Sequence, residues 1–177
     1  VEIDTADALY GDAGITYEGV STKTIIGLDH LEGATVQVLA DGSAHADCTV
    51  TAGQITLNRF ATKVQIGFDS PAQLQTMRAD GGSQDGTTQT RSKSFGEVWA
   101  RLHNTIGGLI GPTFSRLDPI PGLKPASAVG TRPALFSGDR KIEFPAEVGT
   151  DGYICVQSSP MLPMTLVMLS ARMEVND

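Results

Sequence analysis

Apolar and polar residues alternate along several stretches of this chain, and a period of two is typical of half-buried β-strands. The alternation is clearest over residues 35–39 and 54–57, with a third apolar stretch at 48–50. Asp41-Gly42 favours a hairpin turn between two of these stretches, because both turn positions tolerate positive φ, and Ala52-Gly53 marks a second break. The pattern predicts a compact three-stranded meander.

The flanking residues extend this picture in both directions. Residues 28–33 predict a tight turn that leads into the meander, and residues 1–10 predict an edge strand. Residues 15–24 are polar and are interpreted as a connection. Residues 61–68 alternate cleanly and predict a strand that returns the chain to a larger sheet.

The second half of the chain combines strands with long connections. Residues 72–77 predict one helical turn after Pro71, and 78–94 form a polar stretch typical of functional or mobile loops. Gly138-Asp139 predicts a turn, and the prolines of 117–133 indicate a surface crossing. Strands are predicted at 95–104, 141–144, 153–157 and 165–175, the third of them central in its sheet.

Two of these strands have faces that the sequence can assign. In 95–104, one face carries Val98, Ala100 and Leu102, and the other carries Trp99, Arg101 and His103. In 165–175, the same alternation predicts a face formed by Val167, Leu169, Ala171, Met173 and Val175, opposite Leu166, Met168, Ser170, Arg172 and Glu174.

The predicted fold class is all-β, because no stretch offers the crossover helices that a parallel sheet requires. Strands with one apolar face pack well as a sandwich. We therefore expect an antiparallel β-sandwich-like main domain formed by 1–20 and 60–177. A small inserted β-meander or barrel module is expected at 21–59, and it must pack on other strands because a lone hairpin is marginally stable in water.

Composition narrows the function classes. The 177 residues carry a net charge of −7, with a pI near 4.8. An acidic chain is a poor candidate for binding phosphate backbones, because that affinity depends on Lys and Arg. Cys48 and Cys155 lie in strand-like contexts and are interpreted as buried free thiols. No apolar run reaches the length of a membrane span.

Some residues suggest chemistry, and each also has a structural interpretation. Asp29, His30 and Glu32 resemble a metal or acid–base cluster, but neighbouring side chains in a turn diverge. We expect Asp29 to cap the turn and His30 to be hydrogen-bonded. His45 and His103 lie in different segments without a nearby carboxylate and are expected to be structural or exposed.

The remaining candidates are equally weak as sites. Residues 81–86 contain a Gly/Asp turn that calcium could use, but the repeat that makes such motifs meaningful is missing. Ser83, Ser92 and Ser94 have no identifiable base. Trp99 with Arg101 has two interpretations, packing within a strand face or stacking on a sugar or base. We predict no catalytic, cofactor-binding or metal-binding residue.

Several segments of the chain resemble one protein family, the tail tubular protein B family of short-tailed bacteriophages, also called tail nozzle or stabilisation proteins. The most specific segment is Gly27-Leu-Asp-His-Leu-Glu-Gly33, followed by a β-run and Ala40-Asp-Gly42. Weaker segments occur in the same order as in the family. They are Tyr10–Thr16, Val98–Thr105, Leu135–Asp139 and Ser159–Met164.

The resemblance covers nearly the whole chain and implies the C-terminal part of such a protein. It implies a structural component of the virion, assembled in the bacterial host from a phage or prophage. The partners would be identical copies, typically six in a ring, other tail and portal–adaptor proteins, and genomic DNA that passes without specific binding. The alternatives are a carbohydrate- or receptor-binding tail module, or a cell-wall hydrolase, which would need an acid–base pair that the sequence does not display.

Overall fold

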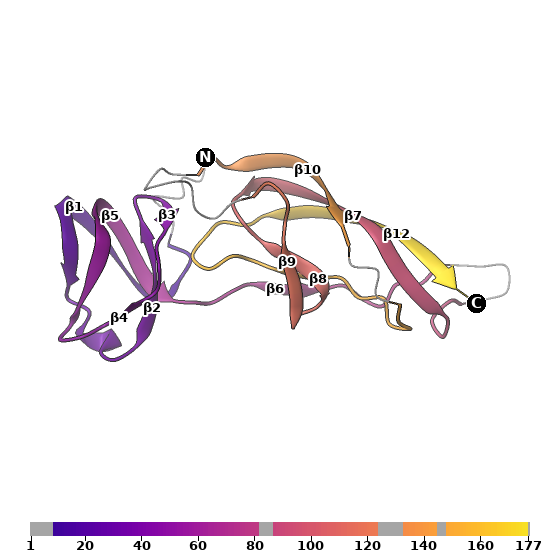
Figure 1. Ribbon diagram of the computed structural model, residues 1–177, viewed down its shortest axis with the longest axis horizontal. Coiled ribbons are helices and arrows are strands. Elements are labelled where there is room, and N and C mark those ends of the chain that lie inside the picture. The colour runs from indigo at the N-terminus through magenta and orange to yellow at the C-terminus, as the bar shows by residue number, and fades with distance from the viewer. Residues whose placement is uncertain (1–8, 82–86, 124–132, 145–147, 177) are drawn as a thin grey trace. The chain divides into compact units, whose positions relative to one another are not determined.

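The computed structural model describes residues 9–81, 87–123, 133–144 and 148–176, and confirms an all-β fold. All strand pairs are antiparallel, and the only helix among these residues is the three-residue 3₁₀ turn η1 (Figure 1). The elements are β1 Asp12–Ile26, η1 Asp29–Leu31, β2 Thr35–Ala40, β3 Ser43–Ala44, β4 Cys48–Thr49, β5 Gln54–Phe68, β6 Gln73–Gln75, β7 Ser92–Thr105, β8 Leu109–Thr113, β9 Arg116–Pro119, β10 Phe136–Glu143, β11 Cys155–Gln157 and β12 Leu166–Asn176.

The chain divides into two compact units. The first unit spans 1–71 with 124–134 and 159–163, and the second spans 72–123, 135–158 and 164–177. The predicted module at 21–59 is therefore only part of the first unit. The reason is that β1 and β5 each run across a predicted boundary, so 12–20 and 60–68 belong to the same sheet as the meander.

The first unit is one sheet with the strand order β1-β5-β2-β3, in which β4 also pairs with β2. The predicted turns are present. Asp41 and Gly42 have φ values of +48° and +74°, and they connect β2 to β3 with two residues. Ala52 and Gly53 also have positive φ and close the turn between Thr51 and Gln54. The unit's core comprises Ile25, Leu28, Leu31, Val36, Val38, Ala40, Val50, Ile55, Leu57, Ala61, Val64 and Ile66.

Two strand predictions in the first unit were wrong. Residues 15–24 are not a connection, since they form most of β1, an edge strand paired with β5. Most of β1 is exposed, so the strand needs few apolar residues and its sequence resembles a loop. The stretches 54–57 and 61–68 are one continuous strand, β5, so the second stretch does not lead into a separate sheet.

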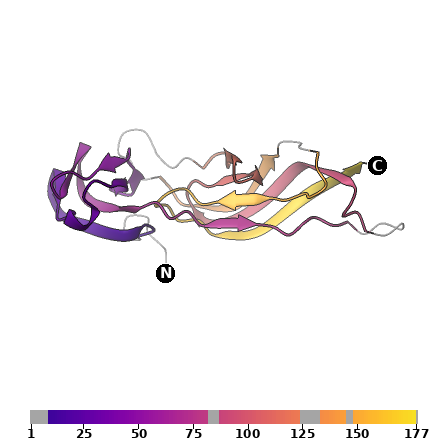
Figure 2. The ribbon, with the colours of Figure 1, turned by 90° about the horizontal axis from the view of Figure 1, so that it is seen from below.

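The second unit is a β-sandwich of two sheets. One sheet has the order β10-β7-β12, and the other has the order β6-β11-β8-β9 (Figure 2). β11 is central in its sheet, as predicted. Both sheets supply the core, which comprises Phe95, Val98, Ala100, Leu102, Ile110, Ile120, Leu123, Ile142, Phe144, Ile154 and Val156.

Bulges change which residues face this core. The inward face of Val98, Ala100 and Leu102 is confirmed, and Phe95 joins it because Gly96 lies opposite no residue of β12. In β12 the prediction was partly wrong. The register slips between Leu166 and Met168, so Leu166 packs against the core while Val167 is exposed. A bulge inserts one residue and shifts the alternation of a strand.

Three local predictions in the second unit were also wrong. Residues 73–75 are the strand β6 instead of a helical turn, because they pair with β11. Gly138-Asp139 lies inside β10, where Gly138 has a φ of +147°. Part of the predicted crossing at 117–133 is the strand β9. Most of the predicted edge strand at 1–10 lies outside the described residues.

Candidate functional site

The turn at Asp29–Glu32 holds the backbone together and does not form a reactive cluster. Glu32 accepts hydrogen bonds from the N–H groups of Ala52 (2.9 Å) and Gly53 (2.7 Å), so it clamps the next turn. The Gly53 and Ala52 N–H groups lower the pKa of Glu32. His30 Nε2 lies 3.3 Å from the Ala13 carbonyl oxygen, as expected of a hydrogen-bonded histidine. The expectation that Asp29 caps the turn was wrong, because the residue that makes the clamping bonds is Glu32.

The other histidines are also bound to the backbone or exposed. His45 Nε2 accepts the Asn58 N–H at 3.1 Å, and its Nδ1 lies 2.7 Å from the Ala46 carbonyl oxygen. Both bonds are satisfied by the neutral ring protonated on Nδ1. His103 lies on the exposed side of β7, where its Nδ1 is 3.4 Å from Ser137 Oγ. These arrangements connect segments of the chain.

The cysteines are free, as predicted, although Cys48 is only half-buried. Burial raises the pKa of both thiols, and for Cys48 the carboxylate of Asp47 raises it further. A thiol with a raised pKa is mainly protonated at neutral pH and is therefore a poor nucleophile.

The predicted Gly/Asp turn at 81–86 lies almost entirely outside the described residues, as does Ser83. Next to it, Asp80 accepts hydrogen bonds from the Thr88 N–H and hydroxyl and from the Thr87 hydroxyl, each at 3.0 Å. The Thr88 N–H is the main cause that lowers the pKa of Asp80. The carboxylate is thus used to close the loop. Across the described ranges, no group of three His, Cys, Asp or Glu residues lies close enough to hold a metal ion.

Trp99 is the most exposed aromatic residue of the second unit and does not pack in the core. It lies in β7, the middle strand of its sheet, and 44% of it is exposed. Lys141 of β10 and Ser170 of β12 lie directly opposite it and therefore share its face. We call this the Trp99 face, and define it by Glu97, Trp99, Arg101, Asp139, Lys141 and Ser170.

Ion pairs fix the charged side chains of the Trp99 face. Arg101 donates two hydrogen bonds to Asp139, from Nε to Oδ1 at 2.7 Å and from Nη2 to Oδ2 at 2.9 Å. Lys141 Nζ lies 2.6 Å from Glu97 Oε1. The Arg101 guanidinium lowers the pKa of Asp139. The result is an indole surrounded by oriented donors and acceptors, which suits the binding of a polar ligand.

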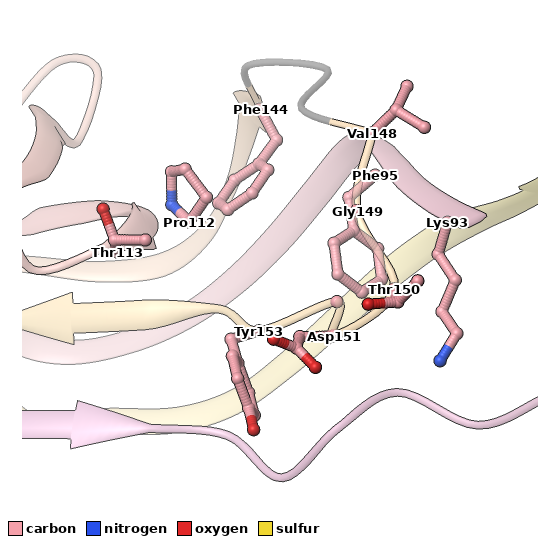
Figure 3. Close-up of a pocket in the computed structure, with 11 residues that line it drawn as sticks. Lys93, Phe95, Pro112, Thr113, Phe144, Val148, Gly149, Thr150, Asp151 and Tyr153 are labelled. Atoms are coloured by element: carbon pink, nitrogen blue, oxygen red, sulfur yellow. The ribbon is translucent and has the colours of Figure 1, made fainter. Parts of the chain in front are cut away.

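A pocket that sequence reasoning missed lies in the second unit (Figure 3). Its volume is about 320 Å³, and Phe95, Phe144 and Pro112 contribute apolar lining while Thr150, Asp151 and Tyr153 contribute polar groups. Lys93 also lines it, is only 1% exposed, and donates from Nζ to the Ala79 carbonyl oxygen at 2.8 Å.

Tyr153, Asp151 and Lys93 of the pocket bind residues outside its lining. Arg78 donates from Nε to Tyr153 Oη at 3.0 Å and pairs with Asp151 at 3.0 Å. Tyr153 first, and then Asp151, raise the pKa of Arg78. Lys93 lies two residues before Phe95 and therefore on the same face of β7. This alternation was the one feature of the sequence that pointed to the pocket, but Lys93 fell within the predicted loop at 78–94. The lining otherwise comes from segments too far apart in sequence to be associated.

No helix among the described residues is long and apolar enough to cross a membrane. Comparison with protein-family models and with curated proteins found no match to this chain.

Proposed function

We propose that this chain is a structural part of the tail tube of a short-tailed bacteriophage. In this role it is not an enzyme. It holds its place in a ring of identical copies, typically six, next to other tail and portal–adaptor proteins. Genomic DNA is retained by the tube and then passes through it without specific binding. The observation that carries the proposal is the segment Gly27–Gly33 followed by Ala40-Asp41-Gly42, which resembles the tail tubular protein B family.

The contacts of this segment support a structural role. Gly27 and Gly33 have φ values of +88° and +75°, which glycine adopts without strain. Glu32 binds two backbone N–H groups, and Asp41 accepts hydrogen bonds from the N–H groups of Thr62 and Lys63. The residues that carry the resemblance therefore fix the backbone conformation of their turns, as is expected of residues with a structural role in a tube wall.

Charge also supports passage of DNA without binding. Residues 9–71 contain seven carboxylates and three Lys or Arg residues. A carboxylate-rich wall repels the phosphate backbone weakly, whereas Lys and Arg contacts would retain it by releasing counterions. We propose that carboxylates of the first unit line the lumen.

We propose that the described parts of the loop predicted at 78–94 contact neighbouring copies in the assembled tube, except that residues 92–94 of that prediction belong to β7. Its described part is tied together at its base by Asp80 with Thr87 and Thr88. Limited proteolysis of the free and the assembled protein tests this role. We expect protection only in the assembly, and equal cleavage in both contradicts the proposal.

Electron microscopy of the full-length protein tests the tube directly. We expect a ring with sixfold symmetry and carboxylates of the first unit facing the lumen. DNA-binding measurements on the same assembly should show no retention at physiological salt. A protein without a closed ring, or a lumen lined mainly by Lys and Arg, contradicts the proposal.

A carbohydrate- or receptor-binding tail module is the second candidate, and the exposed Trp99 face favours it. An indole on an exposed sheet face offers an apolar surface beside the donors of Arg101 and Lys141. A glycan array with the full chain tests this candidate. Binding that is lost in Trp99→Ala but kept in the exposed control Phe60→Ala supports it, and a blank array rules it out.

A further inference from the structure

We propose that two copies of this chain join through the free edge of β6, so that their four-stranded sheets become one continuous sheet. β6 is the end strand of the sheet β6-β11-β8-β9 and pairs only with β11 among the described residues. An unpaired strand edge presents a row of backbone donors and acceptors that another strand can bind.

The hydrogen bonds of β6 show which residues face the free edge. Ser158 N–H donates to the Ala72 carbonyl oxygen, and Thr76 N–H donates to the Ile154 carbonyl oxygen, each at 3.0 Å. Antiparallel strands alternate between residues bonded to one neighbour and residues bonded to the other. The backbone N–H and C=O groups of Ala72, Leu74 and Thr76 therefore point toward β11, and those of Gln73 and Gln75 point away from it. Figure 2 shows β6 and β11 side by side with opposite directions.

An apolar groove beside β6 shows that the sandwich is incomplete on this side. Leu74 lies opposite the core residue Val156 and so faces inward, yet 46% of it is exposed while Val156 is 4% exposed. Both residues line a groove of about 270 Å³ with Met164 and Leu166. Within the described part of the second unit, no side chain covers the open side of this inward-facing leucine.

The edge is complementary to itself, which identifies a second copy as the occupant. When two β6 strands pair antiparallel about a twofold axis at Leu74, Gln73 of each copy lies opposite Gln75 of the other. These are the residues whose backbone groups are available, so the register satisfies them on both sides. Glutamine amides both donate and accept, so they can pair with one another across the axis. The two Leu74 side chains then lie side by side and cover both grooves.

The lack of charged side chains around β6 also supports a second copy as its partner. Residues 70–77 contain no charged side chain in a chain of net charge −7. The other end strands of the sandwich unit each carry charges, namely Arg116 and Asp118 in β9, Asp139 and Lys141 in β10, and Arg172 and Glu174 in β12. Charges on an edge prevent pairing between copies, and β6 lacks that protection.

This inference goes beyond the proposed tube. A twofold contact cannot close a sixfold ring, so the ring needs a different surface and the two proposals fail separately. A chain that forms β6 dimers but no ring contradicts only the tube. A chain that forms the ring but no β6 dimer contradicts only the β6 contact.

Sedimentation equilibrium of the full chain tests the contact. We expect a reversible dimer in the wild type and in Gln75→Thr, which keeps the backbone N–H. Gln75→Pro removes the outward N–H in both copies, and proline is tolerated in edge strands where that group faces solvent. It should weaken the dimer about tenfold or more, because two hydrogen bonds are lost together. Leu74→Lys, which places two ammonium groups against each other, should abolish the dimer.

A cross-link tests the register independently of proline. Directly opposite residues with facing side chains lie about 4.5–5.5 Å apart at Cα, within the range of a disulfide. Leu74→Cys should therefore give an oxidised dimer, with the wild type as the control for Cys48 and Cys155. Circular dichroism verifies that each variant is folded. A monomeric wild type, a Gln75→Pro dimer as tight as the wild type, or a dimer that Leu74→Cys does not cross-link overturns the inference.

Discussion

Two pairs of carboxylates, one pair in each unit of this molecule, perform different tasks. In the first unit, Glu32 and Asp41 accept backbone N–H groups and hold turns in place. In the second unit, Asp139 and Glu97 pair with Arg101 and Lys141 on an exposed sheet face. The described residues of the first unit contain seven carboxylates and three Lys or Arg, whereas those of the second contain seven and eight.

The difference teaches that the acidity of the whole chain is a poor guide to any one surface. A carboxylate that binds the backbone is a structural requirement of its turn and is not exchanged for another residue without cost. A carboxylate in a surface ion pair contributes little to stability, so its position is available for binding. The functional surfaces should accordingly be sought in the second unit, and the acidic wall in the first.

The largest expected effects come from the two cores, which share no residue. Leu28 is completely buried in the first, and Leu102 is 1% exposed in the second. Replacing either with Ala should lower the free energy of unfolding by about 2–5 kcal/mol. Hydrogen exchange should be faster in β5 after Leu28→Ala and in β7 after Leu102→Ala. Equal acceleration of both strands in either variant would mean that the units unfold as one.

The next largest effect concerns the turn clamp at Asp41. Its Oδ1 accepts the Thr62 N–H at 3.1 Å, the Thr62 hydroxyl at 2.9 Å and the Lys63 N–H at 2.9 Å. Asp41→Ala removes all three bonds and should cost about 1–2 kcal/mol, near the low end because the site is partly exposed. Asp41→Asn keeps an acceptor oxygen and serves as the matched control. Chemical denaturation of both variants gives the comparison, and an Asn variant as weak as the Ala variant would contradict it.

Acid titration separates the two kinds of carboxylate. Burial would raise the pKa of Asp41, but the Lys63 and Thr62 bonds outweigh it and lower the pKa, while Arg101 lowers the pKa of Asp139. A carboxylate with a depressed folded pKa stabilises the protein above its unfolded pKa, and this contribution is lost as the pH falls through the folded value. Both units should therefore lose stability in acid.

High salt distinguishes the two causes of a lowered pKa, which are backbone hydrogen bonds at Asp41 and an exposed ion pair at Asp139. Raising the ionic strength to about 1 M shortens the Debye length to about 3 Å and screens exposed ion pairs. In an NMR titration, the pKa of Asp139 should move up toward its ordinary value, and the pKa of Asp41 should change much less. Asp139 in the Arg101→Ala variant is the reference for complete loss of the pair. An equal response of Asp41 and Asp139 would show that their environments are alike.

The sequence predicted those features of the fold that depend on local chemistry. Asp41-Gly42 forms a hairpin turn because Asp and Gly both tolerate positive φ, and the faces of Val98 and Trp99 follow from alternation alone. The errors arose where tertiary pairing decides the structure. β1 has a loop-like composition and is a strand only because β5 pairs with it. The bulge that exposes Val167 depends on the register with β7, which one strand cannot reveal.

The candidate sites were predicted less well than the fold. The structural interpretation of His30 and Glu32 agrees with their hydrogen bonds to the backbone, whereas the cap expected of Asp29 was wrong. The clamp formed by Glu32 depends on a turn twenty residues away. The pocket near Lys93 escaped notice because its lining comes from separate segments. The free edge of β6 could not be predicted, because residues 72–77 were predicted to form a helical turn and a helical turn has no unpaired strand edge.

The smallest expected effect is that of Arg101→Ala on the free energy of unfolding. It tests whether a carboxylate in an exposed ion pair contributes less to stability than one that binds the backbone. The side chains of Arg101 and Asp139 are 51% and 44% exposed. Ion pairs this exposed contribute little, because solvent screens them and ordering both side chains costs entropy. The denaturation midpoint of Arg101→Ala should match that of the wild type and of Arg101→Lys within error. A loss as large as that of Asp41→Ala would mean that this pair is structural. If the loss is absent, Arg101 can be replaced without affecting the fold, so any change in ligand binding by the variant reports on the Trp99 face itself.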